Sequence, residues 1–370
     1  MLDTQFHTLG VVRVIPETND AVSISFGVPS EIKDVFAYSQ GQYLTLRFLI
    51  KGVEVRRAYS MSSSPLEADL TISVKRVKKG IVSNHIFDHI RVGSDVEVMP
   101  PQGRFFTKLD AAQRKTYYLF GAGSGITPLM SILKTTLEEE PQSTIHLLYG
   151  NRSAETIMFK NQLDELQNRY ADQLFVTHIL SQTAKTGGFL KNLFKKTDTT
   201  APSWADKTGR IDENSVREFI EENPCHTKLA EYFACGPGSM TQTVEETLKK
   251  NGVAAQHIHK ELFTAVDSGG VATKGDVVKN ATLIAHLDGE RIETIVGEKI
   301  TFLRALIDLK KDPPYSCTSG ACSTCMAKVL RGTVKMDSCH ALDEDEIANG
   351  YILTCQAHAT SAEVEITYEV

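Results

Sequence analysis

The chain has 370 residues, of which 41% are hydrophobic and 23% are charged, and its formal net charge is −6. This composition excludes a disordered or fibrous chain, and the acidic balance offers no basic face for nucleic acid. No apolar run is long enough to span a bilayer, and the first residues lack the basic and apolar blocks of a signal peptide, so we expect a cytoplasmic protein without membrane insertion.

Residues 1–110 are predicted to form an antiparallel β-barrel. Short β-rich runs, several of which alternate between apolar and polar residues, are separated by turn signals, which is typical of small barrels. One helix is expected over residues 83–89. The predicted strands are residues 11–15, 21–28, 43–49, 70–77 and 95–99.

Three short motifs in this unit have residue types that suit a flavin. The first closes a barrel strand: its arginine can pair with a phosphate, its tyrosine can stack on the isoalloxazine and its serine can approach the flavin N5. The last is a loop that opens a helix and so suits a pyrophosphate. Each motif alone is more often an ordinary strand or turn, and their order and spacing favour the flavin. The residues are Arg57, Ala58, Tyr59, Ser60, Ser73, Val74, Lys75, Gly80, Ile81, Val82 and Ser83.

Residues 111–263 alternate between apolar strands and amphipathic helices, which predicts a parallel α/β sheet. Helices are expected over residues 128–138 and 157–170, and residues 183–206 form a polar stretch of ambiguous structure. The predicted strands are residues 116–120, 144–149, 174–180, 231–235 and 256–261.

A glycine-rich turn lies between the first strand and the first helix of this unit, as a dinucleotide-phosphate loop requires. A second turn follows the strand at 231–235, although an ordinary turn explains that one as well. Arg152 follows the second strand where NAD-specific sheets usually carry an acidic residue, so we expect NADPH to be preferred over NADH; a surface arginine without a ligand is the alternative. The turn residues are Gly121, Gly123, Ser124, Gly125 and Thr127, then Cys235, Gly236 and Pro237.

Residues 264–279 are small and polar and are predicted to be a linker to a third unit, residues 280–370. In that unit, residues 282–287 and 291–296 flank Asp288 and Gly289, a strong hairpin signal, and a helix is expected over residues 302–310.

The cysteines of the third unit follow the spacing C-x4-C-x2-C…C of plant-type [2Fe–2S] proteins. A structural zinc would usually need two close cysteine pairs, and buried free cysteines would make a poor core segment in so polar a loop. Cys339 does not fit the spacing and is interpreted as a bystander. The predicted cluster ligands are Cys317, Cys322, Cys325 and Cys355.

Together these motifs make the chain similar to the ferredoxin–NADP reductase superfamily over residues 1–262, and to plant-type ferredoxins (β-grasp fold) over the last 90 or so residues. The resemblance implies FAD rather than FMN, with Cys235 near the nicotinamide and Thr127 near the flavin. It also implies that Glu261 and Phe263 complete the flavin pocket. Tyr59, Ser60 and Cys235 are therefore the catalytic candidates.

These parts predict an oxidoreductase that takes hydride from NAD(P)H onto a flavin and passes single electrons through the cluster. The domain order resembles the reductase components of bacterial oxygenases, and the local runs at residues 101–105, 147–152 and 209–212 are similar to those of phenylacetyl-CoA epoxidase reductases, so we expect terminal oxygenase subunits as partners. Reductases of steroid, alkane or ring-hydroxylating oxygenases, a ferredoxin module with several partners, and a redox sensor remain alternatives.

Overall fold

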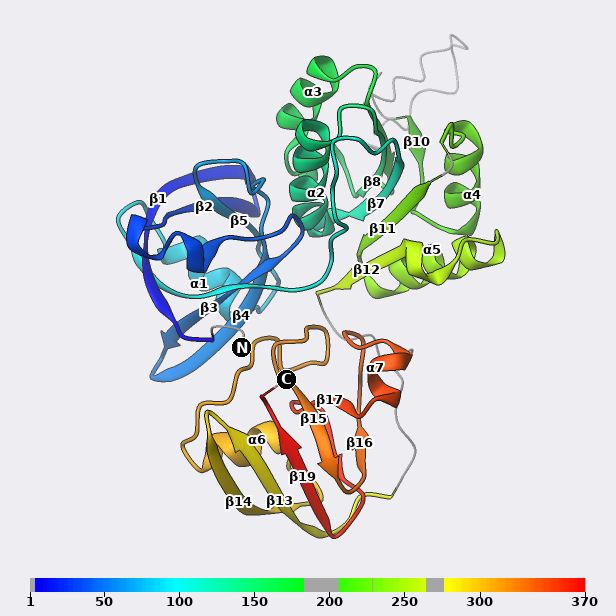
Figure 1. Cartoon of the computed structure of the whole chain (residues 1–370). Helices are drawn as coiled ribbons and strands as arrows, with labels where there is room; N and C mark the ends of the chain where they lie inside the picture. Colours follow the sequence, from blue (N-terminus) through cyan, green and yellow to red (C-terminus); the bar gives the residue numbers. More distant parts are fainter. Residues whose placement is uncertain (1–3, 183–205, 228, 264–275, 370) are drawn as a thin grey trace, which may run out of the picture.

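The computed structural model describes residues 4–182, 206–227, 229–263 and 276–369. The chain forms three domains, each built on its own sheet, with the ferredoxin domain lying below the other two in Figure 1. Within the described ranges, no helix combines the length and the apolar character that a membrane crossing needs.

The first domain is a six-stranded antiparallel sheet in the order β4-β3-β6-β1-β2-β5. A bridge between Met61 and Ile72 brings its two outer strands together, so the sheet closes around a core of inward-facing apolar side chains. Helix α1 (Ile81–His89) packs beside β5. The strands are β1 (His7–Thr18), β2 (Ala21–Gly27), β3 (Tyr43–Ile50), β4 (Val53–Ser60), β5 (Leu70–Lys75) and β6 (Asp95–Gln102).

The second domain is a six-stranded parallel sheet in the order β10-β9-β8-β7-β11-β12. Its strand order reverses between β7 and β11, and ligands of such sheets bind at the carboxyl ends beside that point. Helices α2 and α3 pack on one face, and α4 and α5 on the other. The elements are β7 (Thr116–Ala122), α2 (Ile126–Glu139), β8 (Thr144–Asn151), α3 (Lys160–Arg169), β9 (Leu174–Leu180), β10 (Lys207–Thr208), α4 (Glu213–Glu222), β11 (Ala230–Gly236), α5 (Gly238–Lys250) and β12 (Ile258–Leu262).

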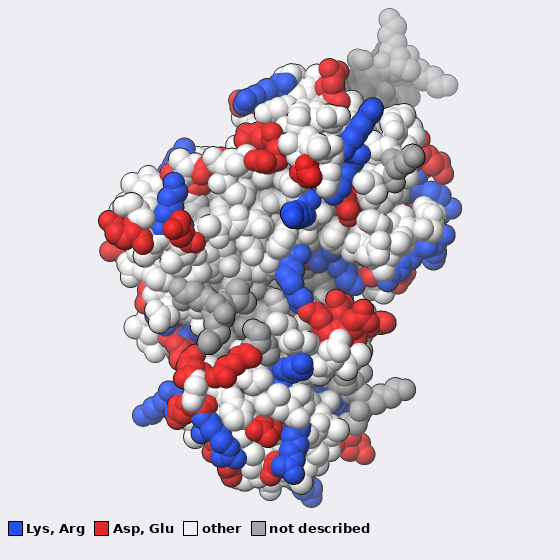
Figure 2. Space-filling view, in the orientation of Figure 1, with Lys and Arg blue, Asp and Glu red and all other residues white. Residues whose placement is uncertain are grey.

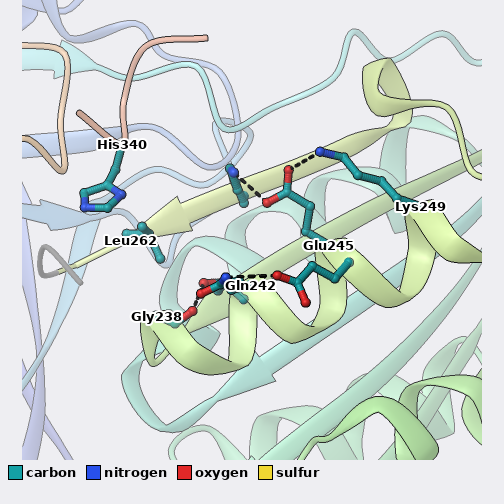
Figure 3. Close-up of a pocket in the computed structure, with 9 residues that line it drawn as sticks. Gly238, Gln242, Glu245, Lys249, Leu262 and His340 are labelled. Carbon is teal, nitrogen blue, oxygen red and sulfur yellow. Dashed lines mark hydrogen bonds and ion pairs between the residues drawn. The ribbon is translucent and has the colours of Figure 1, made fainter. Parts of the chain in front are cut away.

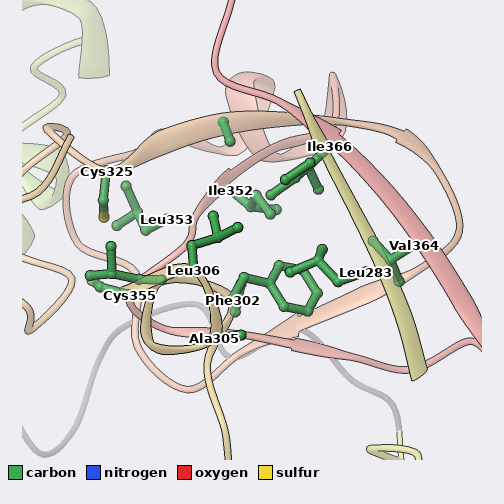
Figure 4. Close-up of a cluster of buried hydrophobic side chains, with 14 of the residues drawn as sticks. Leu283, Phe302, Ala305, Leu306, Cys325, Ile352, Leu353, Cys355, Val364 and Ile366 are labelled. Atoms are coloured by element: carbon green, nitrogen blue, oxygen red, sulfur yellow. The ribbon is translucent and has the colours of Figure 1, made fainter. Parts of the chain in front are cut away.

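The third domain has a mixed sheet in the order β14-β13-β19-β15-β17 and a small sheet of β16 and β18. Asp288 and Gly289 both have positive φ, at 52° and 76°, as the predicted two-residue hairpin requires. Helix α6 covers the sheet with Phe302 and Leu306, and in Figure 4 Leu306 lies between Phe302 and the side on which Cys325 and Cys355 are drawn. The elements are β13 (Asn280–Leu287), β14 (Glu290–Gly297), α6 (Phe302–Asp308), β15 (Met326–Arg331), β16 (Val334–Met336), α7 (Glu344–Ala348), β17 (Tyr351–Leu353), β18 (Ala357–Ala359) and β19 (Glu363–Thr367).

The predicted three-part architecture is confirmed, with small corrections. The helix expected from residue 157 begins at Lys160, because Phe159 adopts a left-handed backbone with φ of 59°. The strand expected to reach residue 77 ends at Lys75. Helices α4 and α5 were not predicted. Residues 183–205 of the ambiguous stretch, and 264–275 of the predicted linker, lie outside the described residues.

Candidate redox sites

Strand β4 carries the first flavin motif to the edge of the barrel that faces the nicotinamide domain. Ser60 is buried, and its hydroxyl donates to Oε2 of Glu261 on β12 at 2.8 Å. Tyr59 is half-buried, and burial raises its pKa. Arg57 is exposed, and its guanidinium donates to the backbone oxygen of Arg56 at 3.0 Å. An exposed cation and a half-buried ring on one strand fit a phosphate and a flat aromatic ligand.

The second flavin motif lies partly in the barrel interior. Ser73 is buried and shares hydrogen bonds of 2.7 Å with both Ser23 and Ser62, so its hydroxyl is used within the barrel. Val74 belongs to the barrel core, while Lys75 is half-buried with Asp20 at 3.6 Å. These side chains stabilise the strand beside the site. Ser73 and Val74 could therefore contact a ligand only through their backbone groups.

The third motif opens helix α1 as predicted. Gly80 is the N-cap, and no side-chain cap bond is made to the start of this helix in the described structure. Val82 and Ser83 are buried, whereas the side chain of Ile81 is 59% exposed. An open helix N-terminus in the same domain as Arg57 suits a negatively charged group.

The glycine-rich turn connects β7 to α2 through the short 3₁₀ helix Gly123–Gly125. Gly123 has φ of 55°, and a Cβ on Gly125 would lie 2.0 Å from the carbonyl oxygen of Cys235. Only glycine therefore allows this close approach of the turn to β11. Thr127 is buried and donates to the backbone oxygen of Ser124 at 3.0 Å, which fixes the turn. The remaining turn residues are the buried Gly121 and the half-buried Ser124.

Cys235 lies at the carboxyl end of β11, in register with Gly121 on one side and Glu261 on the other. Cys235 is buried, and burial raises its pKa well above the ordinary value of a thiol. Burial also raises the pKa of Glu261 to about 7, even though the Ser60 hydrogen bond opposes that shift. The structure thus brings Ser60, Cys235 and Glu261 together at the switch point of the sheet, where Gly236 and Pro237 form the next turn.

Two predicted residues lie at the margin of this site. Arg152 is exposed directly after β8, at the carboxyl end of that strand. Phe263 is 40% exposed at the last described position of the domain.

The four predicted ligand cysteines come together as two pairs. A hydrogen bond from the Cys322 thiol lowers the pKa of Cys317, and one from the Cys325 thiol lowers the pKa of Cys355. Further donors reach the sulfurs: the Ser319 N–H to Cys317 at 3.4 Å and the Gln356 amide to Cys355 at 3.7 Å. Two thiols for each of two irons is the donor set that a [2Fe–2S] cluster requires, so these residues fit the group.

The loop that carries three of these cysteines depends on Gly320. Its φ is 73°, and a Cβ there would lie 2.6 Å from the backbone oxygen of Ser338. Cys339 next to Ser338 is buried in the domain core, and burial raises its pKa to about 11. It lies beside the cysteine loop but belongs to neither pair.

A pocket opens between the nicotinamide and ferredoxin domains, along α5 (Figure 3). The figure shows Lys249 and Glu245 of α5 on one side, and His340 of the ferredoxin domain on the other. Glu245 accepts from Lys249 at 2.8 Å and from Lys260 at 2.6 Å, so these three charged side chains of the pocket are paired with one another. The pocket is lined by residues other than the predicted site residues.

No role was predicted for the residues that join the cysteine loop to the barrel. Tyr43 bonds Thr324, and Arg56 bonds Asp312, both across more than 250 positions of sequence. The pair Arg56 and Arg57 held a usable signal: consecutive residues of a strand face opposite sides, so only one of two consecutive arginines can reach a ligand on a given face.

The chain matches three family models in an order that agrees with these sites. Residues 10–107 match an oxidoreductase FAD-binding domain, residues 119–246 an oxidoreductase NAD-binding domain, and residues 285–360 a 2Fe-2S iron-sulfur cluster binding domain. The protein therefore has an FAD-binding domain, an NAD(P)-binding domain and a [2Fe–2S] domain.

Similar proteins span the same three domains. The chain is 34% identical over 370 residues to one of the subunits of 1,2-phenylacetyl-CoA epoxidase from Escherichia coli, covering 99% of this chain and 98% of that protein. It is 34% identical over 379 residues to the ferredoxin reductase component of 3-ketosteroid-9-alpha-monooxygenase from Rhodococcus rhodochrous, covering 97% and 96%. Phthalate dioxygenase reductase has the same fold, with 23% identity, a TM-score of 0.58 and 98% of each chain covered.

Proposed function

We propose that this protein delivers electrons to a phenylacetyl-CoA epoxidase. The chain belongs to the FAD- and NAD-binding reductases with a C-terminal [2Fe–2S] ferredoxin domain, the reductase components of multicomponent oxygenases. It is an NAD(P)H-dependent flavin and iron–sulfur oxidoreductase. The first domain would hold FAD, which supplies a two-electron hydride acceptor, and the four cysteines would hold a [2Fe–2S] cluster, which supplies one-electron transfer.

The end-to-end similarity to the Escherichia coli epoxidase protein carries the proposal, since it covers all three domains. The local runs at residues 101–105, 147–152 and 209–212 support it. A ketosteroid monooxygenase is the second candidate, because the reductase component from Rhodococcus rhodochrous is 34% identical over a similar length. The partner oxygenase and its substrate distinguish the two candidates.

We assign the site roles by the geometry. Arg57 and the open N-terminus of α1 would bind the FAD phosphates, and Tyr59 would stack on its ring. Ser60, with Glu261 behind it, would hold the flavin edge near Cys235, and the turn from Gly121 to Thr127 would bind the dinucleotide. We further assign residues 1–110, 111–263 and 280–370 to the three domains, residues 264–279 to the linker, and Arg152 to the 2′-phosphate of NADPH.

The ferredoxin unit has the charge expected for docking on a basic partner. Residues 279–370 contain nine Lys and Arg and 14 Asp and Glu, a net charge of 9 − 14 = −5, which leaves −1 for the rest of the chain. Opposite charge would steer this unit to a basic patch on the oxygenase.

Reconstitution with the partner tests the proposal. The purified holoprotein is mixed with phenylacetyl-CoA epoxidase catalytic subunits, NADPH and phenylacetyl-CoA, and product is measured. A parallel reaction contains the oxygenase component of a 3-ketosteroid monooxygenase and its steroid. Product formation with the epoxidase alone supports the proposal. Turnover with the steroid enzyme alone would assign the second candidate, and turnover with neither would reject both partners.

A further inference from the structure

Arg56 is a buried cation that the redox sites do not use. Its side chain is 4% exposed, next to the exposed Arg57 on β4. Its Nε donates to Glu54 at 2.9 Å, and its Nη2 donates to Asp312 at 2.6 Å. Asp312 belongs to the ferredoxin domain, five positions before Cys317, so one barrel arginine reaches the segment that leads into the cysteine loop.

The guanidinium of Arg56 also lies between two aromatic rings. Its Cζ is 4.1 Å from the ring centroid of Tyr315 and 4.9 Å from that of Phe6. The Tyr315 hydroxyl donates to Glu54 at 3.4 Å, so the carboxylate and the arginine both hold the same tyrosine. A planar cation suits such a stacked and bidentate position, and a lysine would not replace it.

Tyr43 makes a second contact inside the cysteine loop. It is buried on β3 in register with Ser60, and its hydroxyl lies 2.8 Å from Oγ1 of Thr324. Thr324 stands between Cys322 and Cys325, and the Cys322 thiol is 3.5 Å from the same oxygen. Gly103 leaves room for the tyrosine, because a Cβ there would lie 2.9 Å from the ring.

A third contact joins the barrel to helix α7 of the ferredoxin domain and to the segment before it. Arg104 forms an ion pair with Glu346 of α7 and donates to the backbone oxygen of Ala341 at 3.4 Å. Acidic and basic side chains lie side by side along this boundary in Figure 2. Arg104 follows Gly103 directly, and Gly103 lies against the Tyr43 ring, so the contacts of Arg104 and Tyr43 are neighbours on the barrel.

We propose that Arg56 and Tyr43 are positioning residues that dock the cysteine loop on the flavin barrel, one before the loop and one within it, and so set how fast electrons pass from the FAD to the cluster. The contact of Tyr43 with Thr324 brings the cysteine loop close to the position on β3 that pairs with Ser60 of β4. The proposal rests on the assignment of the flavin to β4 and of the cluster to the four cysteines.

Arg56 and Asp312 differ in exposure, which gives two variants of different strength. Asp312 is 67% exposed, so Asp312→Asn removes a partly solvated ion pair and leaves both domains intact. Arg56→Met removes the buried cation itself and keeps its hydrophobic stem. Arg47→Met is the matched control: Arg47 lies opposite Arg56 in register and also stacks on Phe6, at 4.1 Å, but its carboxylate partner is Glu97 of the barrel.

Hydrogen exchange of the full-length holoprotein reports docking without any turnover. We expect exchange of the amides at 312–325 to accelerate about fivefold in Asp312→Asn, and by roughly tenfold or more in Arg56→Met. Arg47→Met should exchange there like the wild type. Unchanged exchange in both Asp312→Asn and Arg56→Met would overturn the docking contact, and the first of these variants decides the matter if the second fails to fold.

Anaerobic stopped-flow absorbance then separates the two electron steps. Flavin reduction by NADPH should keep its wild-type rate in Asp312→Asn, while the later cluster-reduction phase slows and the visible spectrum of the oxidised cluster is unchanged. Tyr43→Phe should slow the same phase, and Tyr38→Phe, which removes a hydroxyl bonded to Ser63 within the barrel at 2.8 Å, should not. Looser exchange with an unchanged cluster phase would overturn the kinetic role. A wild-type protein that lacks flavin or cluster absorbance would instead show that the site assignments are wrong.

Discussion

The barrel shares a hydrophobic core with the nicotinamide domain but, among the described residues, not with the ferredoxin domain. Phe105 and Ala21 of the barrel belong to the same buried cluster as residues of α2 and β7, and the rings of Phe105 and Phe233 meet edge to face at 5.3 Å. At the same interface the Gly41 N–H donates to Ser131 at 3.3 Å. Separating the two domains would expose these apolar side chains to water, which is unfavourable. The two reductase domains therefore behave as one unit.

The ferredoxin domain has a core of its own. Its buried cluster draws on residues 281–366 of the described chain, and its hydrogen bonds to the barrel are polar contacts of Tyr43, Arg56, Arg104 and Glu54. Polar contacts between two separate cores can break and reform, unlike a shared core. The difference predicts that damage to the cluster stays in one domain, whereas damage at the flavin reaches two.

The largest effect is expected from Cys325→Ser, which replaces a soft thiolate ligand with a hydroxyl. The variant should lose its cluster absorbance and keep a full complement of flavin, because the reductase domains have a separate core. NADPH-dependent reduction of ferricyanide should persist, and transfer to the oxygenase should fall to background.

Cys339→Ser is the matched control for that variant, since Cys339 is equally buried beside the loop but belongs to neither cysteine pair. It should retain both the cluster and oxygenase coupling. Loss of the cluster in Cys339→Ser but not in Cys355→Ser would show that the ligand set is wrong. Full coupling without a cluster would mean that electrons leave from the flavin.

Arg57→Ala tests the other side of the comparison. Loss of a charge-assisted hydrogen bond to a phosphate should cost about 2–3 kcal/mol of FAD binding, so the variant should release flavin on dilution. Since the two reductase domains share a core, their common thermal transition should fall together while the ferredoxin transition stays in place. Arg13→Ala, on an exposed barrel arginine paired with Asp69, should retain the flavin. Stoichiometric FAD in Arg57→Ala at low protein concentration would contradict the assignment.

Arg152→Ala should change cofactor choice without changing either interface. We expect KM for NADPH to rise about tenfold, because a 2′-phosphate loses a charged partner, and KM for NADH to stay near its wild-type value. NADH is the internal control, since it has a hydroxyl where NADPH has the phosphate. Equal changes for both cofactors would show that Arg152 does not contact the 2′-phosphate.

Local sequence signals were sufficient for most of the elements and for the cysteine spacing. The hairpin at Asp288 and Gly289 and the turn at Gly123 depend on backbone conformations that the residue types themselves favour. Helix α4 also has a local signal, a capping box between Asp212 and Ser215 at its start.

Contacts between domains could not be predicted in this way. The hydrogen bond from Ser60 to Glu261 spans 201 positions, and that from Arg56 to Asp312 spans 256. Such pairs are decided by how three independently patterned units pack, and one sequence contains no local record of that packing. The residue types still limit the possible partners of Arg56, since a buried arginine requires a hydrogen-bond acceptor nearby.

The smallest effect concerns Glu261, which lies on the shared interface of the two reductase domains. Burial raises its pKa from 4.5 to about 7, so the carboxyl is neutral in the folded protein over a pH range where it is charged in the unfolded chain. The folded state then binds the extra proton. This contribution to the free energy of unfolding is fully present below pH 4.5 and is lost as the pH rises through 7.

Glu261→Gln keeps an oxygen for the Ser60 hydroxyl but cannot ionise, so it should remove this pH dependence. Between pH 5 and pH 8 the wild type should lose on the order of 1 kcal/mol relative to the variant. This is less than the shift alone implies, because a partly exposed carboxyl is rehydrated when it ionises. Chemical unfolding of the reductase transition, followed by flavin fluorescence, measures the difference. Ser60→Ala should move the midpoint to higher pH, since the lost hydrogen bond favours the charged form. Parallel pH profiles for wild type and Glu261→Gln would mean that Glu261 is solvated as a carboxylate, and that the barrel does not seal this edge of the shared interface.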